Sequence, residues 1–229
     1  MMAARRNPFA SAEVAQGYDA WFATPVGAVV DRLEKRLIMR MATPRTRESA
    51  LDVGTGTGHY AACLADLGMQ VTGIDPSAAM LAVARARPID VTWREGDATA
   101  LPYADGSFDL VLSVTALEFV ADAAAALAEM YRVLRPGGRL VVAVLNAQSP
   151  WARARQREAL EADTPFRQAR FYAPGEFAAL LSRLGRPAWS SAVYVGPDGE
   201  GMRFADLLER LGQAFSRGRG ALLVGRVEK

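Results

Sequence analysis

Two patterns of apolar residues divide the chain near residue 48. Before that point, apolar positions recur at helical spacing, with Leu33, Leu37 and Met41 at i, i+4 and i+8, which is typical of a helix with one buried stripe. Beyond it, continuous apolar runs such as residues 110–112 and 140–145 alternate with helical stretches. Continuous runs indicate strands covered on both faces, so the pattern predicts a parallel sheet between layers of helices.

The same pattern gives the order of the elements. Two helices are expected first, at residues 11–23 and 26–42, with Ser11 as an N-cap and Pro25 in the first turn of the second. Strands are predicted at 51–53, 71–75, 91–95, 108–113, 140–145, 188–195 and 221–227, and later helices near 59–67, 76–81, 122–134, 150–162, 174–184 and 203–214.

Composition narrows the class of protein. The 229 residues, 51% apolar and 23% charged, suit a single globular domain. A net charge of +2 leaves no basic footprint for nucleic acid. No run of 18 apolar residues predicts a membrane span, and the first eight residues lack the apolar stretch of a signal peptide, so a cytoplasmic protein is expected. Cys63 is the only cysteine, so neither an intrachain disulfide nor a cysteine metal site is expected.

The most informative local feature is the glycine-rich stretch that follows the first strand. Asp52 ends an apolar run, and Gly54, Gly56 and Gly58 follow at alternate positions before a helix. Glycine tolerates positive φ and lets a ligand approach bare backbone at a helix N-terminus. A dinucleotide fold requires G-x-G-x-x-G, and its third glycine would fall at His59. The spacing therefore disfavours a pyrophosphate cradle.

This turn resembles the first motif of class I S-adenosylmethionine (SAM)-dependent methyltransferases. Further landmarks of that family follow in order: Asp75 at the end of a second strand, Asp97 after a third, a fourth strand at 108–113, and Pro136-Gly137-Gly138 before the fifth. Together they are similar to the small-molecule methyltransferases of the ubiquinone/menaquinone biosynthesis type, which are methyltransferase type 11-like. By these motifs the chain resembles this family.

The resemblance implies an α/β fold. It is a Rossmann-like, seven-stranded, mostly parallel sheet of order 3-2-1-4-5-7-6, with strand 7 antiparallel, helices on both faces and an N-terminal helical lid. We expect one class I methyltransferase domain over residues 1–229. Within it, residues 1–47 form the lid, 48–145 the SAM-binding core, and 146–229 the substrate-shaping helices and last strands.

The implied cofactor is S-adenosyl-L-methionine, with S-adenosyl-L-homocysteine as product. By the resemblance, Asp52 helps to hold the ammonium, Asp75 binds the ribose hydroxyls, Met80 packs on the adenine, and Asp97 with Ala98 meets the adenine edge. Ligands of open α/β sheets bind beyond the carboxyl ends of the strands, which adds the residues after strand four. The expected cofactor-binding set is Tyr18, Asp52, Gly54, Thr55, Gly56, Gly58, Asp75, Pro76, Met80, Asp97, Ala98, Val114 and Thr115.

Three residues are candidates for catalysis. Tyr18 lies in an aromatic segment that related enzymes fold over the cofactor, although an aromatic helix face is also common in a core. His59, the only histidine, could act as a neutral base at a helix N-terminus, or it could simply face solvent. Glu118 follows the fourth strand, where it could reach a substrate or lie on a solvent-facing helix. No metal site is expected.

Residues 146–172 offer less specific candidates. Asn146 follows the fifth strand, and Phe171 and Tyr172 could close a substrate pocket. The arginine-rich stretch at 153–170 could bind an anionic substrate or form a solvated helix face.

Several functions compete. The leading hypothesis is methyl transfer from SAM to a small-molecule acceptor by in-line displacement. The alternative is a SAM- or SAH-binding protein with a non-methylating or regulatory role. A nicotinamide-dependent oxidoreductase is disfavoured by the glycine spacing. A nucleic-acid amino methyltransferase typically carries Asn/Asp-Pro-Pro-aromatic after strand four, where this chain has residues 113–116, Ser-Val-Thr-Ala. The acceptor, its nucleophilic atom (O, N, C or S) and the oligomeric state stay open.

Overall fold

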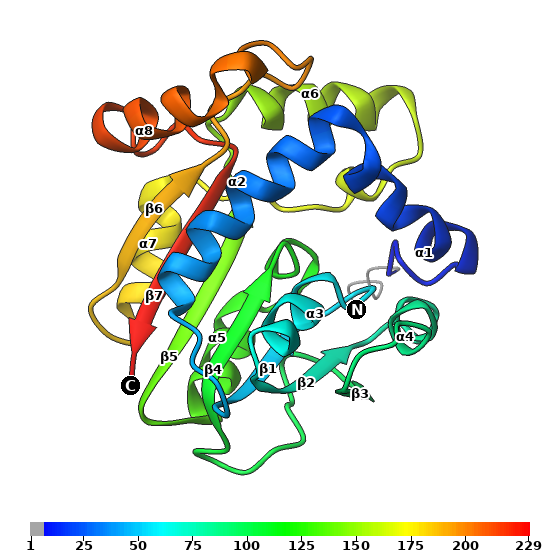
Figure 1. The fold of residues 1–229 in the computed structure, drawn as a ribbon, viewed down its shortest axis with the longest axis vertical. Helices are drawn as coiled ribbons and strands as arrows, with labels where there is room; N and C mark the ends of the chain where they lie inside the picture. The colour runs from blue at the N-terminus through cyan, green and yellow to red at the C-terminus, as the bar shows by residue number, and fades with distance from the viewer. Residues whose placement is uncertain (1–6) are drawn as a thin grey trace.

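A single seven-stranded sheet organises the protein. The computed structural model describes residues 7–229, so the first six residues of the expected lid lie outside the described part. The strands are β1 (Ser49–Val53), β2 (Gln70–Asp75), β3 (Val91–Glu95), β4 (Phe108–Val114), β5 (Leu134–Leu145), β6 (Ala188–Ala192) and β7 (Leu222–Glu228). Their order is β3-β2-β1-β4-β5-β7-β6 (Figure 1). Strand β7 is antiparallel to β5 and β6, whereas the other neighbours are parallel. This confirms the predicted sheet order.

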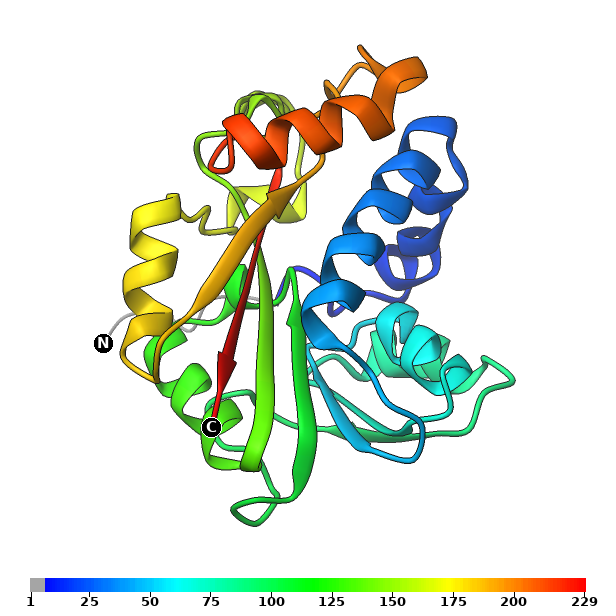
Figure 2. The same ribbon diagram turned by 60° about the vertical axis from the view of Figure 1, so that its left-hand side comes forward.

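Helices cover both faces of the sheet. They are α1 (Ala12–Tyr18), α2 (Pro25–Ala42), α3 (His59–Asp66), α4 (Ala78–Arg85), α5 (Ala123–Arg132), α6 (Pro150–Glu161), α7 (Pro174–Ser182) and α8 (Ala205–Phe215), with 3₁₀ turns η1 (Asp19–Ala23), η2 (Leu117–Phe119), η3 (Pro165–Arg167) and η4 (Met202–Phe204). Figure 2 shows α2 and α3 on one side of the sheet and α5 and α7 on the other. Polar residues fix several starts, since Ser11, Ser77 and Ser149 each accept a backbone N–H of the first helical turn.

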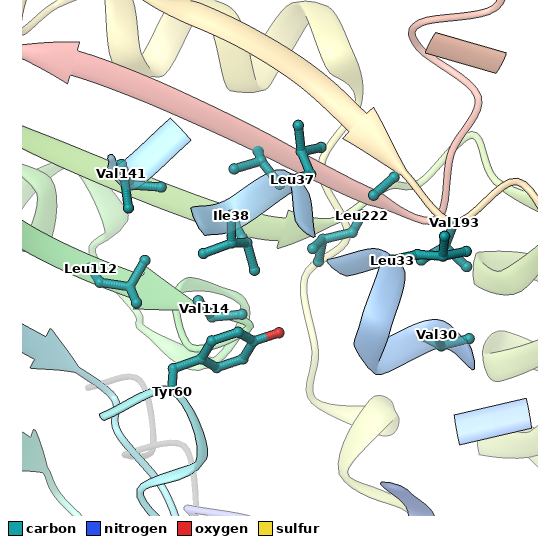
Figure 3. Close-up of a cluster of buried hydrophobic side chains, with 14 of the residues drawn as sticks. Val30, Leu33, Leu37, Ile38, Tyr60, Leu112, Val114, Val141, Val193 and Leu222 are labelled. Atoms are coloured by element: carbon teal, nitrogen blue, oxygen red, sulfur yellow. The ribbon is translucent and has the colours of Figure 1, made fainter. Parts of the chain in front are cut away.

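Two apolar cores follow from these layers. One joins α2 and α3 to the sheet, and Figure 3 shows Leu33, Leu37 and Ile38 of α2 pointing into it with Tyr60 and Val114. The other joins α5 and α7 to the opposite face. Because the central strands are covered on both sides, their side chains are apolar in both directions, which explains the continuous runs in the sequence.

Several elements differ from their predicted bounds by a few residues, and two of them have a clear structural reason. The helix expected at 11–23 ends at Tyr18 and continues as the 3₁₀ turn η1. Asp19 accepts hydrogen bonds from Thr57 and Arg87, and Thr24 already caps α2, so the residues between them take a tighter turn. Strand β5 begins at Leu134 rather than at 140, because Leu134 pairs with Phe108 before the chain bulges outward and regular pairing resumes.

The carboxyl ends of β1, β2, β3 and β4 meet at one rim of the sheet, and α1, η1 and α2 stand beside that rim (Figures 1 and 2). The fold thus places the glycine-rich stretch and the N-terminal helices on opposite sides of a shared space. Within residues 7–229, no helix combines the length and apolar character needed to cross a membrane.

Candidate cofactor and acceptor site

A cavity of about 700 Å³ opens at this rim. Its walls come from the segments after β1, β2, β3 and β4 and from α1, η1, α2 and α3. Ligand cavities in proteins span a few hundred to about 1,000 Å³, so this one accommodates a ligand of nucleoside size with a further small molecule. We call the part beyond the strand ends the cofactor half and the part against α1, η1 and α2 the acceptor half.

The glycine turn forms one wall of the cofactor half. Gly54 has a φ of +73°, and a Cβ added there would lie 2.2 Å from the Cβ of Ala116. Gly56 has a φ of +55°, lines the cavity, and has no protein atom within 4 Å of an added Cβ. Packing therefore requires glycine at Gly54, whereas Gly56 presents bare backbone to the cavity.

Gly58 has a different place from the other two. It also has a positive φ, but an added Cβ would lie 2.5 Å from the ring of Trp93, and Gly58 does not line the cavity. The structure therefore places it behind the wall, where it lets the start of α3 pack closely on β3.

Asp75 is held rigidly at the end of β2. One carboxylate oxygen accepts the Gly56 N–H at 2.8 Å and the other accepts the Ser77 N–H at 2.8 Å. Burial raises the pKa of Asp75, and the two N–H groups oppose that rise. Each oxygen keeps a second lone pair, and Asp75 lines the cavity. The carboxylate is thus preorganised to accept ligand hydroxyls.

Asp52 adds a second buried carboxylate. It accepts the Thr55 hydroxyl at 2.7 Å. Burial raises the pKa of Asp52 to about 7, with the Asp75 charge adding to the rise and Thr55 opposing it. Among the residues that line the cavity, all within 7–229, none is lysine or arginine. The negative charge of this wall is therefore left for a cationic, hydrogen-bond-donating ligand to balance.

The remaining expected cofactor residues lie together along the same half. Met80 is buried at the start of α4, and Asp97 accepts both the N–H and the hydroxyl of Thr99, which fixes its turn. The structure brings the following predicted residues to the cavity: Tyr18, Asp52, Gly54, Thr55, Gly56, Asp75, Pro76, Met80, Asp97, Ala98, Val114 and Thr115.

Thr115 has a strained backbone. Its φ is +48°, which is rare for a β-branched residue. The Thr115 N–H nevertheless bonds to the carbonyl of Ala143 at 2.8 Å, and its side chain meets Tyr18 across the cavity. Strain of this kind costs on the order of 1–3 kcal/mol and is concentrated at functional sites. The strain marks the end of β4 as part of the site.

The N-terminal helices are fastened over the cavity by polar contacts. Asp19 accepts the Thr57 hydroxyl at 2.7 Å and pairs with Arg87, which also donates to the Thr57 carbonyl. The ring of Phe22 stacks on His59, with centroids 4.2 Å apart and planes 4° apart. These contacts join η1 directly to the glycine turn and to the start of α3.

His59 is held from both sides. Its Nε2 lies 2.7 Å from an Asp31 carboxylate oxygen of α2. Burial opposes a low pKa for Asp31, but hydrogen bonds from His59 and Lys35 lower it. His59 lines the cavity, with one ring nitrogen engaged and one face covered by Phe22.

The acceptor half contains a carboxylate that belongs to none of the sequence motifs. Glu34 lines the cavity and faces Tyr60, and burial raises its pKa to about 7, opposed by Arg155 and by Tyr60 itself. The sequence carried a signal, because Glu34 lies midway between Val30 and Ile38 at i+4 spacing and so interrupts a buried helix face. A charge in such a stripe predicts a polar partner or a cavity.

Tyr18 and Tyr60 supply two hydroxyls to this half. Burial raises the pKa of Tyr18 to about 12, and the neighbouring Glu34 adds to the rise. The Tyr60 hydroxyl is buried without a hydrogen bond of standard geometry among the described residues. An unsatisfied buried hydroxyl is costly, so a ligand donor or acceptor there is favoured.

Other candidates lie outside the cavity. Glu118 is fully buried behind its wall, where one oxygen accepts the Leu145 N–H at 2.6 Å, and burial raises its pKa to about 7. Asn146 donates to the carbonyls of Gly218 and Gly220 and so anchors the loop before β7. Phe171 and Tyr172 pack in the cores. From the segment 150–172, Gln168 lines the cavity and the arginines do not.

The residues of the cofactor half fit SAM. This cofactor joins an adenosine with two ribose hydroxyls to a sulfonium and an ammonium group. Asp75 offers two preorganised acceptors, Asp52 a buried negative charge, and Gly56 a wall without side chain. The residues that would hold it are therefore those of the glycine turn and of the ends of β2, β3 and β4.

Comparisons with known proteins agree. A family model described as a methyltransferase domain matches residues 51–142. Demethylmenaquinone methyltransferase of Beutenbergia cavernae is 46% identical over 123 residues, covering 54% of this chain and 51% of the relative. The ubiquinone/menaquinone biosynthesis C-methyltransferase UbiE of Rubrivivax gelatinosus is 38% identical over 125 residues, covering 54% and 50%. The chain spans about half the length of these curated relatives.

A solved structure matches over nearly the whole chain. It is a SAM-dependent methyltransferase from Thermotoga maritima, described as a possible histamine N-methyltransferase, with a TM-score of 0.74 and 27% identity, covering 95% of this chain and 97% of that one. Residues 51–142 thus match a methyltransferase domain, and the chain as a whole is similar to class I SAM-dependent methyltransferases. Within this class it is similar to the ubiquinone/menaquinone type, and SAM is the cofactor of the family.

Proposed function

We propose that the protein transfers a methyl group from SAM to a small-molecule acceptor. One observation carries the proposal: the acidic, glycine-walled cofactor half and the aromatic acceptor half are parts of a single cavity. Bound SAM supplies a methyl group on a positively charged sulfur, which a nucleophile displaces in line. The protein's contribution to such a reaction is alignment, exclusion of water and, where needed, removal of a proton.

Named residues divide this work. Asp75, Asp52 and the Gly54–Gly56 turn would bind and orient the cofactor, while the helices fastened through Asp19 would exclude water. Tyr18 and Thr115 meet where the two halves join. In the acceptor half, His59 and Glu34 line the cavity with atoms that can accept a proton, and Glu118 would act only from behind the wall.

A small acceptor is favoured over a nucleic acid. Nucleic-acid binding depends on lysine and arginine at the phosphates, and neither residue type lines this cavity. The curated relatives named above are quinone methyltransferases, which also act on small molecules. No feature of the cavity favours a SAM-binding regulator over an enzyme.

The test has two stages. Calorimetric titration of the purified protein should show binding of S-adenosylhomocysteine and none of NAD, and the reverse result would overturn the proposal. Transfer of radiolabel from methyl-labelled SAM to a metabolite extract of the source cells should then give a labelled small product. At a SAM concentration near the wild-type Kd, Asp75→Ala should strongly reduce the label, while the exposed Asp90→Ala should keep it. SAH binding without labelled product from any extract would favour a regulator.

A further inference from the structure

The charge of the acceptor half points to the chemistry of the acceptor. Glu34 is enclosed by protein yet keeps accessible surface, because its side chain faces the cavity. It projects from the face of α2 that otherwise packs into the core, and no ion pair with it occurs among residues 7–229. A buried carboxylate without a paired cation is unfavourable unless a ligand balances it.

Most of the groups around Glu34 do not supply that balance. Tyr18 of α1, Tyr60 of α3, Asp31 of α2, Glu118 after β4 and Glu209 of α8 are neutral or acidic. Among the described residues, Arg155 of α6 is the basic side chain whose charge acts most strongly on Glu34.

Arg155 is itself buried, and Glu34 is the charged group that acts most strongly on it, although the two side chains form no ion pair among the described residues. Its guanidinium lies over the rings of Trp151 at 5.4 Å and Phe166 at 4.7 Å, and it does not line the cavity. Its positive charge, which lies outside the cavity, therefore lowers the free-energy cost of burying Glu34 but does not fill the space in front of the carboxylate.

Aromatic rings complete this half. Tyr18, Phe22 and Tyr60 line the cavity beside Glu34, and Tyr18 and Phe22 meet edge to face with centroids 6.1 Å apart. Aromatic faces attract cations within about 6 Å. A carboxylate among aromatic rings, with no lysine or arginine in the lining, is a receptor for a cation and repels an anion.

We infer that the methyl acceptor is a small basic amine, bound as its ammonium form by Glu34 among these rings, and that Glu34 takes the proton the nitrogen must lose before methylation. The inference rests on the proposed function and narrows its substrate class. In the proton transfer one N–H bond breaks, its electron pair stays on nitrogen as the lone pair, and the proton moves to a Glu34 carboxylate oxygen. The acid returns the proton to solvent when the product leaves.

Glu34 is suited to this exchange. A carboxyl group whose pKa lies near 7 can hold a cation when ionised and can also accept a proton at neutral pH. A phenol or alcohol acceptor could use the same carboxylate as a base, but it would leave the negative charge unbalanced in the bound state. That alternative is an outcome of the test.

The test uses three probes of equal ring size and different charge: benzylamine, benzyl alcohol and benzoate. Each is titrated calorimetrically into the full chain saturated with S-adenosylhomocysteine. We expect benzylamine to bind at least 10-fold more tightly than the alcohol and benzoate not to bind. Glu34→Gln should remove the amine preference, whereas Glu13→Gln, an exposed glutamate of α1, should keep it. Equal affinities, or tighter alcohol binding, would overturn the inference.

A permanently charged probe isolates the carboxylate. In the chain saturated with S-adenosylhomocysteine, affinity for benzyltrimethylammonium should rise about 10-fold between pH 6 and pH 8 as Glu34 ionises. Most of that rise should vanish in Glu34→Gln, because the other carboxyl of the cavity with a pKa of about 7, Asp52, belongs to the cofactor half. An undiminished rise in the variant contradicts the assignment. The two proposals fail separately, because lack of S-adenosylhomocysteine binding rejects the methyltransferase function, while its binding without an amine preference rejects only the amine. The wild-type probe series decides the matter even if the variant does not fold.

Discussion

The two halves of the cavity are built in different ways. The cofactor half comes from one stretch of chain, 52–116, and depends on backbone: positive φ at Gly54 and Gly56, N–H groups on Asp75, and the ends of parallel strands. The acceptor half gathers side chains from α1, η1, α2 and α3, held together by cross-element contacts such as Asp19 with Thr57. A rigid backbone site can serve many enzymes, while the side chains of the other half set the acceptor.

The largest effect should come from the backbone of the cofactor half. In Gly54→Ala the new methyl group would overlap Ala116 at 2.2 Å, and a residue with a side chain would be forced to a φ near +73°. We expect affinity for S-adenosylhomocysteine to fall at least 100-fold, which is about 2.7 kcal/mol, measured by calorimetry. Gly17→Ala, in open space at a negative φ, should bind as the wild type does. Retained affinity in Gly54→Ala would show that the turn can move.

This contrast explains how much the sequence could reveal. The sheet order was predictable only through the family resemblance. The residues that line the cofactor half were easier to predict, because a positive φ and a close approach permit little but glycine, and a strand end permits a carboxylate at a fixed offset. Gly58 shows the limit of that reasoning, because the same spacing that suggested a ligand contact serves packing against Trp93 instead. A motif specifies the residue type without specifying what the residue touches.

The acceptor half was harder to predict, since its members meet only after folding. Glu34 lies 26 positions from Tyr60 by sequence number, and no local rule joins them. Glu118 was proposed from its place after β4, but a 3₁₀ turn carries it behind the wall. Phe171 and Tyr172 were expected at a pocket and instead pack in the cores. Such outcomes depend on packing between distant elements, which hydrophobic spacing does not encode.

The next largest effect tests the side chain of the cofactor half. Asp75→Ala should weaken S-adenosylhomocysteine binding by roughly 1–3 kcal/mol, because ligand hydroxyls and the N–H groups of Gly56 and Ser77 lose their acceptor. Calorimetry on the folded variant measures the loss, with the exposed Asp90→Ala as control. Unchanged affinity would exclude Asp75 from the ribose site and weaken the comparison with the family.

A comparison of Glu118 with Glu34 tests which of the two buried glutamates faces the cavity. Both have a pKa of about 7, but only Glu34 lines the cavity. A pKa raised by folding adds stability below the unfolded value near 4.5, and that stability is lost as pH rises through 7. Glutamine mimics the neutral acid and does not titrate. From pH 5 to pH 8 the unfolding free energy of the wild type should therefore fall by about 2 kcal/mol relative to that of Glu118→Gln.

Chemical denaturation across that pH range measures the Glu118 effect. S-adenosylhomocysteine and benzylamine should bind Glu118→Gln as they bind the wild type, because the side chain lies behind the wall. A parallel pH dependence of the two proteins would mean that Glu118 is ionised in the fold, and altered ligand binding would move it into the site.

The smallest effect tests the contacts that join the two halves. Asp19→Ala removes the acceptor for Thr57 and the partner of Arg87, which together fasten η1 to the glycine turn. Because the pair is partly exposed, we expect the free energy of ligand binding to weaken by only about 1 kcal/mol. It should appear as a roughly 5-fold faster dissociation of S-adenosylhomocysteine in stopped-flow measurements, with little change in Tm. Asp66→Ala, an exposed change on α3, should leave the rate unaltered. If Asp19→Ala also releases ligand at the wild-type rate, the N-terminal helices shape the acceptor half without controlling access to the cofactor half.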